Sequence, residues 1–293
     1  MRVGVHGRPL DDKTIGYVKS LLQVLHRLGV SVAFTDRFAE EVTQHGMVSG
    51  KPEVIPYATG VKDMDLDFML SLGGDGTLLD TVTYVGAVQT PILGINLGRL
   101  GFLATTPKDD LEKALEELAA GSYTLDLRTL VRLDSDADLF GDHNFALNEV
   151  AILKQDTSSM IVVHTFINGE YLNSYWADGL IVATPTGSTG YSLSCGGPMV
   201  LPRSKNFVLT PVSPHNLNVR PLVVSDASVI SFEIEGRSRN FLVAMDSRSH
   251  TVDPQVQLAV RKEAFGANLV KLNGYNYLDT LRQKLHWGLD MRN

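Results

Sequence analysis

The hydrophobic pattern of this 293-residue chain changes its period near residue 122. Before that point, short strand-like apolar runs alternate with stretches in which apolar residues recur at helical spacing. The strand-like runs cover residues 3–6, 30–34, 66–72 and 91–95. Because such alternation is typical of a mostly parallel sheet covered by helices, residues 1–121 are predicted to form an α/β domain.

A helix is predicted to close this first domain. Thr106 suits its N-cap, Pro107 its first position and Asp109 the partner position of a capping box. Leucines at helical spacing follow and predict a buried stripe, formed by Leu111, Leu115 and Leu118.

After residue 122, apolar and polar residues alternate, as they do in half-buried strands. From Tyr123 to Leu133 the apolar residues fall on odd positions. Two hairpins are predicted, one around Asn168-Gly169 and one around Gly236. The second hairpin would join residues 228–235 to residues 241–245, and further strands are predicted at 256–260 and 269–272.

These patterns predict an all-β second domain over residues 122–273. The last segment returns to helical spacing at Leu278, Leu281 and Leu285. A C-terminal helix within residues 274–293 is therefore expected, and we expect it to pack back on the first domain.

Composition excludes several classes of protein. Apolar residues make up 44% and charged residues 20%, which argues against a disordered chain. The formal charge of -7 disfavours a partner made of nucleic acid or an anionic membrane. The single cysteine, Cys195, excludes an internal disulfide framework and a multi-cysteine zinc site. No apolar run reaches the roughly 18 residues of a spanning helix, and the start lacks the apolar stretch of a signal peptide. We expect a cytoplasmic protein.

The sequence Gly73-Gly74-Asp75-Gly76-Thr77 follows a predicted strand and precedes a predicted helix. Glycines allow backbone N–H groups to approach phosphate oxygens, and a helix N-terminus adds partial positive charge. The segment matches neither the Walker A pattern nor the dinucleotide G-x-G-x-x-G pattern. Asp-Gly is also a common turn pair, so the residues alone leave a phosphate loop and a simple tight turn both open.

Two further segments carry polar chemistry. Asn148-Glu149 offers an amide beside a carboxylate, which suits adjacent ribose hydroxyls, although a polar turn is the simpler interpretation. Residues 178–198 form a hydroxyl- and glycine-rich segment after a strand-like run, and Tyr191 within it could stack on a base. A Ser/Gly-rich linker is the alternative for this third segment.

In this order and spacing, the three segments resemble those of the NAD kinase family. Matching pieces also occur at residues 94–103, 214–217 and 220–222, so the resemblance runs from about residue 66 to about residue 246. The glycine-aspartate motif is shared with diacylglycerol and sphingosine kinases, and a related form occurs in phosphofructokinases. The third segment is much more specific to NAD kinases.

The resemblance implies an enzyme that transfers the terminal phosphoryl group of ATP to the 2′-hydroxyl of the adenosine ribose of NAD. It implies Mg²⁺ or another divalent cation, and a homo-oligomer, either a dimer or a tetramer. Residues 1–121 would then be a nucleotide-binding domain and residues 122–273 an NAD-binding domain.

By match to the family motifs, Asp75 would accept the proton of the attacking hydroxyl. The phosphate loop would be Gly73, Gly74, Gly76 and Thr77. The NAD-binding residues would be Asp75, Gly76, Asn148, Glu149, Asp178, Thr186, Thr189, Gly190, Tyr191, Ser192, Leu193 and Ser194. The motif match assigns no metal ligands.

Two other readings of the sequence stay open at this point. One is a lipid kinase that shares the glycine-aspartate motif; the third segment and the lack of a basic amphipathic helix argue against it. The other is a non-catalytic module that senses NAD, and the presence of Asp75 argues against it. The sequence does not choose between ATP, other triphosphates and polyphosphate as donor, or between NAD and NADH as acceptor.

Overall fold

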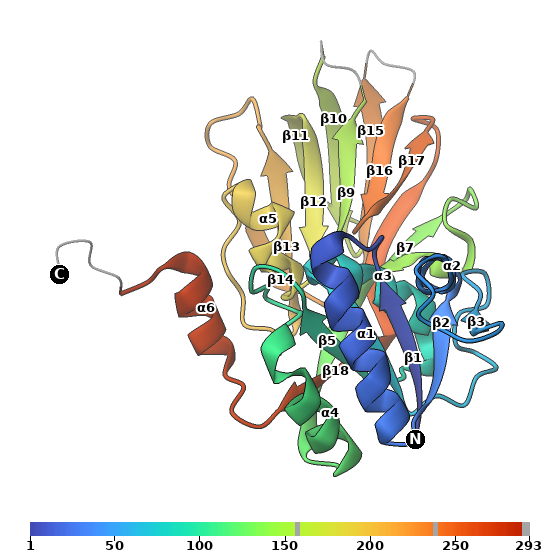
Figure 1. The fold of residues 1–293 in the computed structure, drawn as a ribbon. Helices are drawn as coiled ribbons and strands as arrows, with labels where there is room; N and C mark the ends of the chain where they lie inside the picture. The colour runs from blue at the N-terminus through green and yellow to red at the C-terminus, as the bar shows by residue number, and fades with distance from the viewer. Residues whose placement is uncertain (156–158, 237–239, 289–293) are drawn as a thin grey trace. The chain divides into compact units, whose positions relative to one another are not determined.

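The computed structural model describes residues 1–155, 159–236 and 240–288. The chain separates into two compact units, Met1–Leu127 with Ala267–Asn293, and Arg128–Gly266 (Figure 1). Two long strands, β7 (Tyr123–Ser135) and β18 (Leu258–Leu272), contain both boundaries between the units. The alternating pattern of a strand therefore begins before the second unit does. The predicted domain limits at residues 121 and 273 remain predictions.

The first unit contains a parallel sheet with helices on both faces. Its strands are β1 (Arg2–Gly7), β2 (Ser31–Thr35), β3 (Glu53–Ile55), β4 (Phe68–Gly73), β5 (Ile92–Asn96) and β6 (Thr106–Pro107). The order is β3-β2-β1-β4-β5, and the end of β18 pairs in parallel with β5 through Leu269 and Ile92. All of these pairings are parallel.

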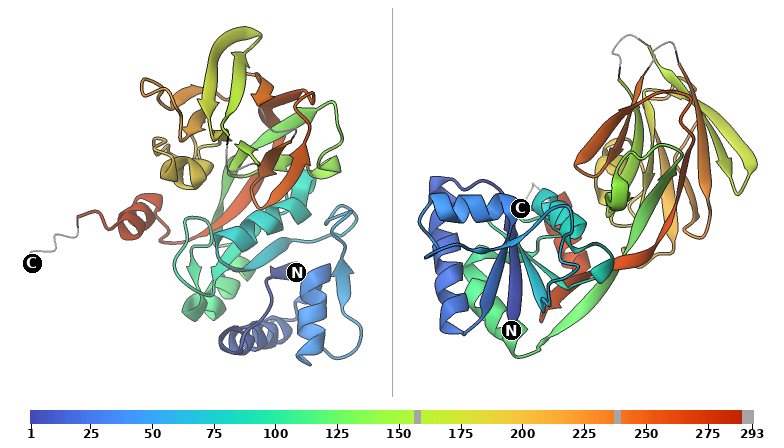
Figure 2. Two further views of the ribbon diagram at one scale, coloured as in Figure 1. Left: turned by 90° about the horizontal axis from the view of Figure 1, so that it is seen from above. Right: turned by 90° about the vertical axis from the view of Figure 1, so that its right-hand side faces the viewer.

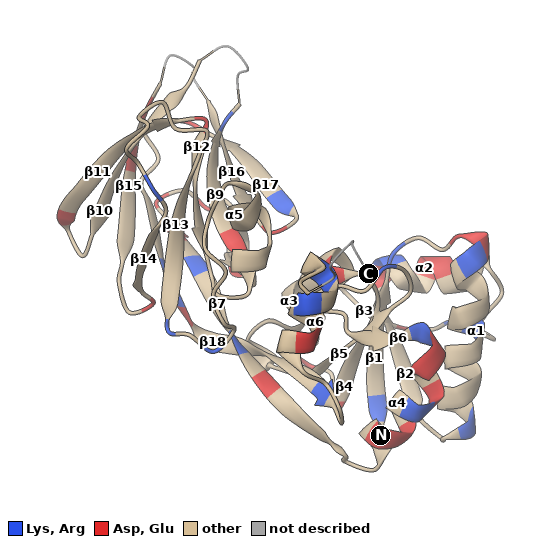
Figure 3. Ribbon diagram, turned by 90° about the vertical axis from the view of Figure 1, so that its left-hand side faces the viewer, with Lys and Arg blue, Asp and Glu red and all other residues tan. Residues whose placement is uncertain are grey.

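Helices cover this sheet because each carries an apolar stripe. They are α1 (Asp12–Arg27), α2 (Asp36–Gln44), α3 (Asp75–Val85) and α4 (Leu111–Ala119). A further helix, α6 (Tyr277–Leu285), follows β18. Apolar residues of α1, α2 and α4 share one core with alternate residues of β1, β4 and β5. Figure 2 shows α1 and α2 on one face of the sheet and α3 on the other. Acidic and basic residues are interspersed along α1, α2 and α4 (Figure 3).

The predicted start of the helix that closes this unit is wrong. Thr106 and Pro107 form the short strand β6, paired with Ile95 and Asn96 of β5. A 3-10 turn, Lys108–Asp110, follows, and α4 begins at Leu111 without a side-chain cap. Pairing with β5 holds Thr106 in the sheet, so its side chain does not cap α4. The predicted leucine stripe of α4 is buried.

The second unit is built from two sheets. One contains β10 (Ile161–Ile167), β11 (Glu170–Ala177), β15 (Ile230–Gly236), β7, β8 (Phe145–Ala146) and the start of β18. The other has the order β14-β13-β12-β9-β16-β17, with β14 (Leu222–Ser225), β13 (Asn206–Val212), β12 (Gly179–Ala183), β9 (Glu149–Lys154), β16 (Phe241–Met245) and β17 (Arg248–Val252). The short helix α5 (Tyr191–Ser194) follows β12. The predicted fold class, an α/β unit with a mostly parallel sheet plus a β-rich unit, is confirmed.

The hairpin predicted around Gly236 is wrong. β15 pairs with β10 and β18 in one sheet, whereas β16 pairs with β9 and β17 in the other. Alternate residues of β15 and of β16 nevertheless enter the same core. The chain therefore crosses from one sheet to the other, and both apolar faces are buried. Residues 237–239, at the predicted turn, lie outside the described residues.

Other expectations for the second unit had mixed outcomes. The hairpin around Asn168-Gly169 is confirmed, since β10 and β11 pair across it. The two strands predicted at 256–260 and 269–272 are one strand, β18. The alternation from Tyr123 to Leu133 fails at Leu125 and Leu127, which are exposed, while Arg128 is buried.

The C-terminal helix is present as α6, capped by the side chain of Asn276. Thr280 and Leu281 of this helix are buried, and its packing on the first domain remains a prediction. Among the residues that the structure describes, no helix is long and apolar enough to cross a membrane.

Candidate active site

The glycine-aspartate segment connects β4 to α3, as the sequence predicts. β4 ends at Gly73, Gly74 is the N-cap of α3, and no side chain caps the first amide groups of this helix. A Cβ atom on Gly73 would overlap the side chain of Thr77, which is buried. The predicted phosphate loop thus lies at the carboxyl end of a parallel strand, where open α/β sheets bind ligands.

The carboxylate of Asp75 is held by the loop after β5. Its Oδ2 accepts the N–H of Phe102 at 2.8 Å, and its Oδ1 accepts those of Leu103 and Ala104 at 2.9 and 3.1 Å. A Cβ atom on Gly101 would overlap this carboxylate. Gly101 is therefore glycine because the Asp75 side chain fills the space beside it.

The segment 94–103 has a structural purpose that the sequence alone does not reveal. A Cβ atom on Gly94 would lie 2.8 Å from both the Cα of Ala104 and a methyl carbon of Leu78. The Asn96 side chain accepts the N–H of Gly98 at 2.7 Å and donates to the carbonyl of Arg99 at 2.6 Å. The segment is thus a fixed loop that brings backbone donors to Asp75.

In the second unit, Asn148 and Glu149 lie at a turn held by Asp246. The Asp246 carboxylate accepts the N–H groups of Leu147 at 2.8 Å, Asn148 at 2.9 Å and Glu149 at 3.3 Å. Asp246 has a left-handed backbone, with φ of 51°. Arg248, two residues later, donates to the carbonyls of His143 and Phe145. The chain before Asn148 is therefore fixed from the turn between β16 and β17.

Two buried carboxyl groups lie close together at this turn. Burial, and then the nearby charge of Asp246, raises the pKa of Glu149 to about 8. Burial also raises the pKa of Asp246, although its three amide donors and Arg248 act in the opposite direction. The Oε2 atom of Glu149 is buried without a hydrogen-bond partner. Near neutral pH, Glu149 therefore carries a proton and can donate a hydrogen bond to a ligand hydroxyl.

The hydroxyl-rich segment packs against the same turn. Thr184 donates through its hydroxyl to the carbonyl of Leu147 at 2.6 Å and through its N–H to that of Asn148 at 2.8 Å. A Cβ atom on Gly187 would overlap the backbone of Asn148, and one on Gly190 would lie 3.3 Å from Oε2 of Glu149. The structure therefore brings together Asn148, Glu149 and Gly190, which the sequence predicts as NAD-binding residues.

Several predicted hydroxyl groups bond within the loop itself. Thr186 is buried and accepts Nη1 of Arg128 at 3.1 Å. Thr189 donates to the carbonyl of Thr186 at 3.2 Å, and the buried Ser192 shares a hydrogen bond of 2.7 Å with Thr210. The side chains of Thr186 and Ser192 thus hold the loop in shape.

The remaining predicted residues surround α5. Tyr191 is exposed, and its pKa is raised by burial of the hydroxyl and by nearby negative charge, which includes Asp178 and Glu149. Asp178 precedes β12 and pairs with Lys154 of β9 at 2.6 Å. Leu193 and Ser194 lie in α5 beside Tyr191 and are not fully buried. Tyr191 is therefore a partly exposed ring near the carboxyl groups of Asp178 and Glu149.

Three partners of site residues were not predicted from the sequence: Asp246, Arg128 and Lys154. Asp246 lies 97 residues beyond Glu149, so no local pattern connects the two. One signal was available: an aspartate directly after a strand often adopts a left-handed turn conformation. Arg128 falls among polar positions expected to face solvent, and no pattern marks it as buried.

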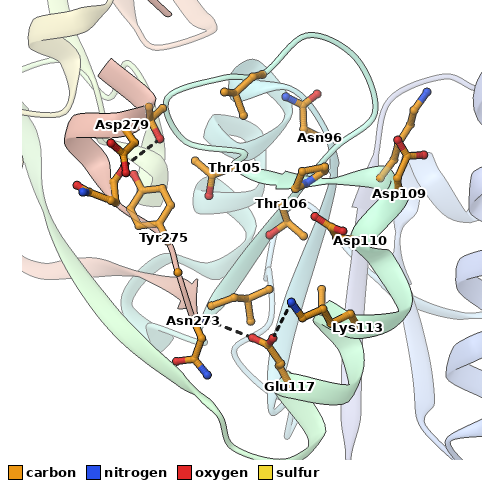
Figure 4. A pocket seen from close by; sticks show the side chains of 18 of the residues that line it. Asn96, Thr105, Thr106, Asp109, Asp110, Lys113, Glu117, Asn273, Tyr275 and Asp279 are labelled. Atoms are coloured by element: carbon orange, nitrogen blue, oxygen red, sulfur yellow. Dashed lines mark hydrogen bonds and ion pairs between the residues drawn. The ribbon is translucent and has the colours of Figure 1, made fainter. Parts of the chain in front are cut away.

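A cavity of about 600 Å³ lies elsewhere in the first unit (Figure 4). It is bounded by the loop after β5, by α4 and by the segment that leads into α6. Lys113 pairs with Glu117 at 3.8 Å, and Glu117 accepts the N–H of Asn273 at 3.3 Å. None of the predicted site residues lines this cavity. Its volume therefore does not locate the candidate site.

A parallel sheet with a glycine loop at one strand end, joined to a β-rich unit, defines a two-domain nucleotide-binding protein. Comparison with known proteins identifies the family. Residues 3–123 match the ATP-NAD kinase N-terminal domain and residues 147–272 match the ATP-NAD kinase C-terminal domain. The chain belongs to the NAD kinase family.

Similar proteins agree with this assignment. An NAD kinase from Cytophaga hutchinsonii is 54% identical over 100% of both chains, and one from Flavobacterium psychrophilum is 42% identical over 100% of both. The crystal structure of yeast NADH kinase complexed with NADH has a TM-score of 0.87 at 26% identity, covering 100% of this chain and 89% of that one. The structure of an NAD kinase from Archaeoglobus fulgidus in complex with ATP has a TM-score of 0.76 at 29% identity, covering 98% and 99%. The predicted family and the predicted NAD kinase activity are confirmed.

Proposed function

We propose that the chain transfers the terminal phosphoryl group of ATP to the 2′-hydroxyl of the adenosine ribose of NAD, producing NADP and ADP. The first unit supplies the phosphate loop, formed by Gly73, Gly74, Gly76 and Thr77. The second unit supplies the dinucleotide residues, with Asn148 and Glu149 on the ribose and Tyr191 against a base. The remaining proposed NAD-binding residues of the second unit are Asp178, Thr186, Thr189, Gly190, Ser192, Leu193 and Ser194.

Asp75 is the group that accepts the hydroxyl proton. The observation that carries this role is the fixed position of its carboxylate, which accepts three backbone N–H groups at the start of α3. A carboxylate has about four lone-pair sites, so one is left for the sugar hydroxyl. Phosphoryl transfer proceeds through a loose transition state, so a weak but well-placed base is sufficient.

A divalent cation enters with ATP as part of the substrate. Mg²⁺ usually keeps several waters and binds phosphate oxygens with one or two protein carboxylates. Within the described ranges, no group of three or more His, Cys, Asp and Glu side chains is placed to hold a metal ion. When bound, the cation neutralises charge on the transferring group.

The test is formation of NADP from NAD, ATP and Mg²⁺, measured with an enzyme that accepts only NADP. Asp75→Asn should lower kcat by about 10²- to 10⁴-fold, the usual contribution of a general base, with NAD affinity nearly kept. Asp12→Asn, an exposed position in the first turn of α1, is the matched control. Near-normal turnover of Asp75→Asn would show that the proton goes elsewhere. Phosphorylation of diacylglycerol or a sphingoid base instead of NAD would favour a lipid kinase.

The homo-oligomeric state implied by the family resemblance and the cytoplasmic location expected from the sequence remain part of this proposal. Sedimentation of the purified protein distinguishes a monomer from a dimer or tetramer.

A further inference from the structure

A basic side chain that belongs to none of the sequence motifs, Arg8, lies at the start of α3. Arg8 is the first residue after β1, which pairs in parallel with β4 through Gly7 and Leu72. Continuing this register by one residue sets Arg8 level with Gly73, the last residue of β4. Arg8 therefore leaves the sheet at the same carboxyl edge as the glycine loop.

The guanidinium of Arg8 covers the backbone of Gly76. A Cβ atom added to Gly76 would lie 2.5 Å from Nη2, 3.4 Å from Cζ and 3.7 Å from Nη1 of Arg8. All three atoms belong to one planar group, so this group lies against the first turn of α3. A side chain at position 76 would displace it. The absence of a side chain at Gly76 therefore leaves room for the guanidinium of Arg8 against the backbone.

The same turn presents backbone donors. No side chain caps the first amide groups of α3, and a helix N-terminus attracts phosphate through its partial positive charge. A guanidinium adds a full charge and paired N–H donors that match two phosphate oxygens. A polyphosphate at the start of α3 would contact both the backbone N–H groups and the guanidinium.

The acidic neighbour of Arg8 holds it only weakly. Nη2 lies 3.9 Å from Oδ2 of Asp80 on α3, and the two side chains are 59% and 33% exposed. Exposed ion pairs of this kind contribute little to stability, because water and salt screen them. A triphosphate can therefore take the guanidinium from Asp80 at small cost.

We propose that Arg8 binds the terminal phosphates of ATP over the glycine loop, and that Asp80 keeps the guanidinium above Gly76 until ATP arrives. This assignment rests on the proposed function, because it adds a residue to the phosphate end of the same reaction. A cation at this point stabilises bound ATP and the charge spread over the phosphoryl oxygens during transfer.

Steady-state kinetics of the full-length enzyme test the assignment. Arg8→Gln should raise the KM for ATP by about ten- to a hundredfold, the usual effect of losing a charge-assisted hydrogen bond, and leave the KM for NAD unchanged. Arg8→Lys keeps the charge but loses the planar guanidinium, so its KM for ATP should lie between those of the wild type and Arg8→Gln. Arg27→Gln is the matched control: Arg27 is 58% exposed, pairs with Glu112, and should behave as wild type.

Calorimetry with a non-hydrolysable ATP analogue provides a readout independent of turnover. Arg8→Gln should bind it more weakly than wild type, and Asp80→Asn at least as tightly as wild type. A wild-type KM for ATP and wild-type analogue affinity in Arg8→Gln would overturn the assignment. A lower melting temperature together with equal rises in the KM for ATP and the KM for NAD would also overturn it. Weaker analogue binding by Asp80→Asn would overturn the role given to Asp80. Failure of the proposed function differs from all of these, since wild type itself would then make no NADP.

Discussion

The buried carboxyl of Glu149 makes the stability of the protein depend on pH in a predictable direction. Its pKa rises from 4.5 to about 8 in the folded protein, because it is buried and close to Asp246. Between these pH values the unfolded chain releases the proton and the folded protein keeps it. The free energy of unfolding therefore falls as pH rises through this window.

The size of this loss follows from the same values. A rise of about 3.5 pH units, at about 1.4 kcal/mol each, gives an upper limit of about 5 kcal/mol. Glu149→Gln keeps the size of the side chain and cannot ionise. Relative to wild type, this variant should gain stability steadily from about pH 5 to about pH 8.

Urea denaturation of the nucleotide-free protein, at several values across this pH range, measures the effect. The informative quantity is the difference between wild type and variant at each pH, because other titrating groups cancel in it. Glu170→Gln removes an exposed carboxylate in the same unit and is the matched control. Parallel curves for wild type and Glu149→Gln would refute the reasoning, since Glu149 would then titrate alike in both states.

Three further predictions concern the proposed reaction. Tyr191→Ala should weaken NAD binding by about ten- to a hundredfold in calorimetry, and Tyr191→Phe only slightly, because stacking needs the ring and not the hydroxyl. Unchanged affinity in Tyr191→Ala would remove this ring from the site. Asn148→Ala should raise the KM for NAD and also lower kcat, since a misplaced ribose loses its attack geometry; an unchanged KM would count against it. Gly101→Ala should lower kcat without abolishing NAD binding, because the new Cβ would displace the Asp75 carboxylate.

The fold could be predicted where a pattern identifies which face of an element is buried. Apolar residues at helical spacing and alternating apolar residues identified the buried face of most helices and strands. Alternation does not say which sheet a strand joins, because Phe232 in β15 and Val243 in β16 enter the same core from opposite sheets. The predicted hairpin between them failed for this reason. The cap assigned to Thr106 failed because pairing with β5 overrode a local preference.

The site could be predicted in its ligand-facing parts and not in its supports. Glycines and hydroxyls next to strand ends indicate a ligand loop from local sequence alone. Asp246 contributes through hydrogen bonds to backbone groups nearly a hundred residues earlier, and such contacts leave no trace in the residues that receive them. The buried Arg128 behind Thr186 is hidden in the same way.

Asp75 and Asp246 show why a motif and its mechanism must be separated by experiment. Each carboxylate accepts three backbone N–H groups and thereby fixes a loop, Asp75 in the first unit and Asp246 in the second. A loss of activity in Asp75→Asn could therefore come from a loosened loop or from a missing base. Gly101→Ala disturbs the same loop and leaves the carboxylate ionisable. If Asp75 is the base, Asp75→Asn must lose more kcat than Gly101→Ala, because a displaced carboxylate can still accept a proton and an amide cannot. Equal losses would show that the position of the side chain, and not its ionisation, controls the rate.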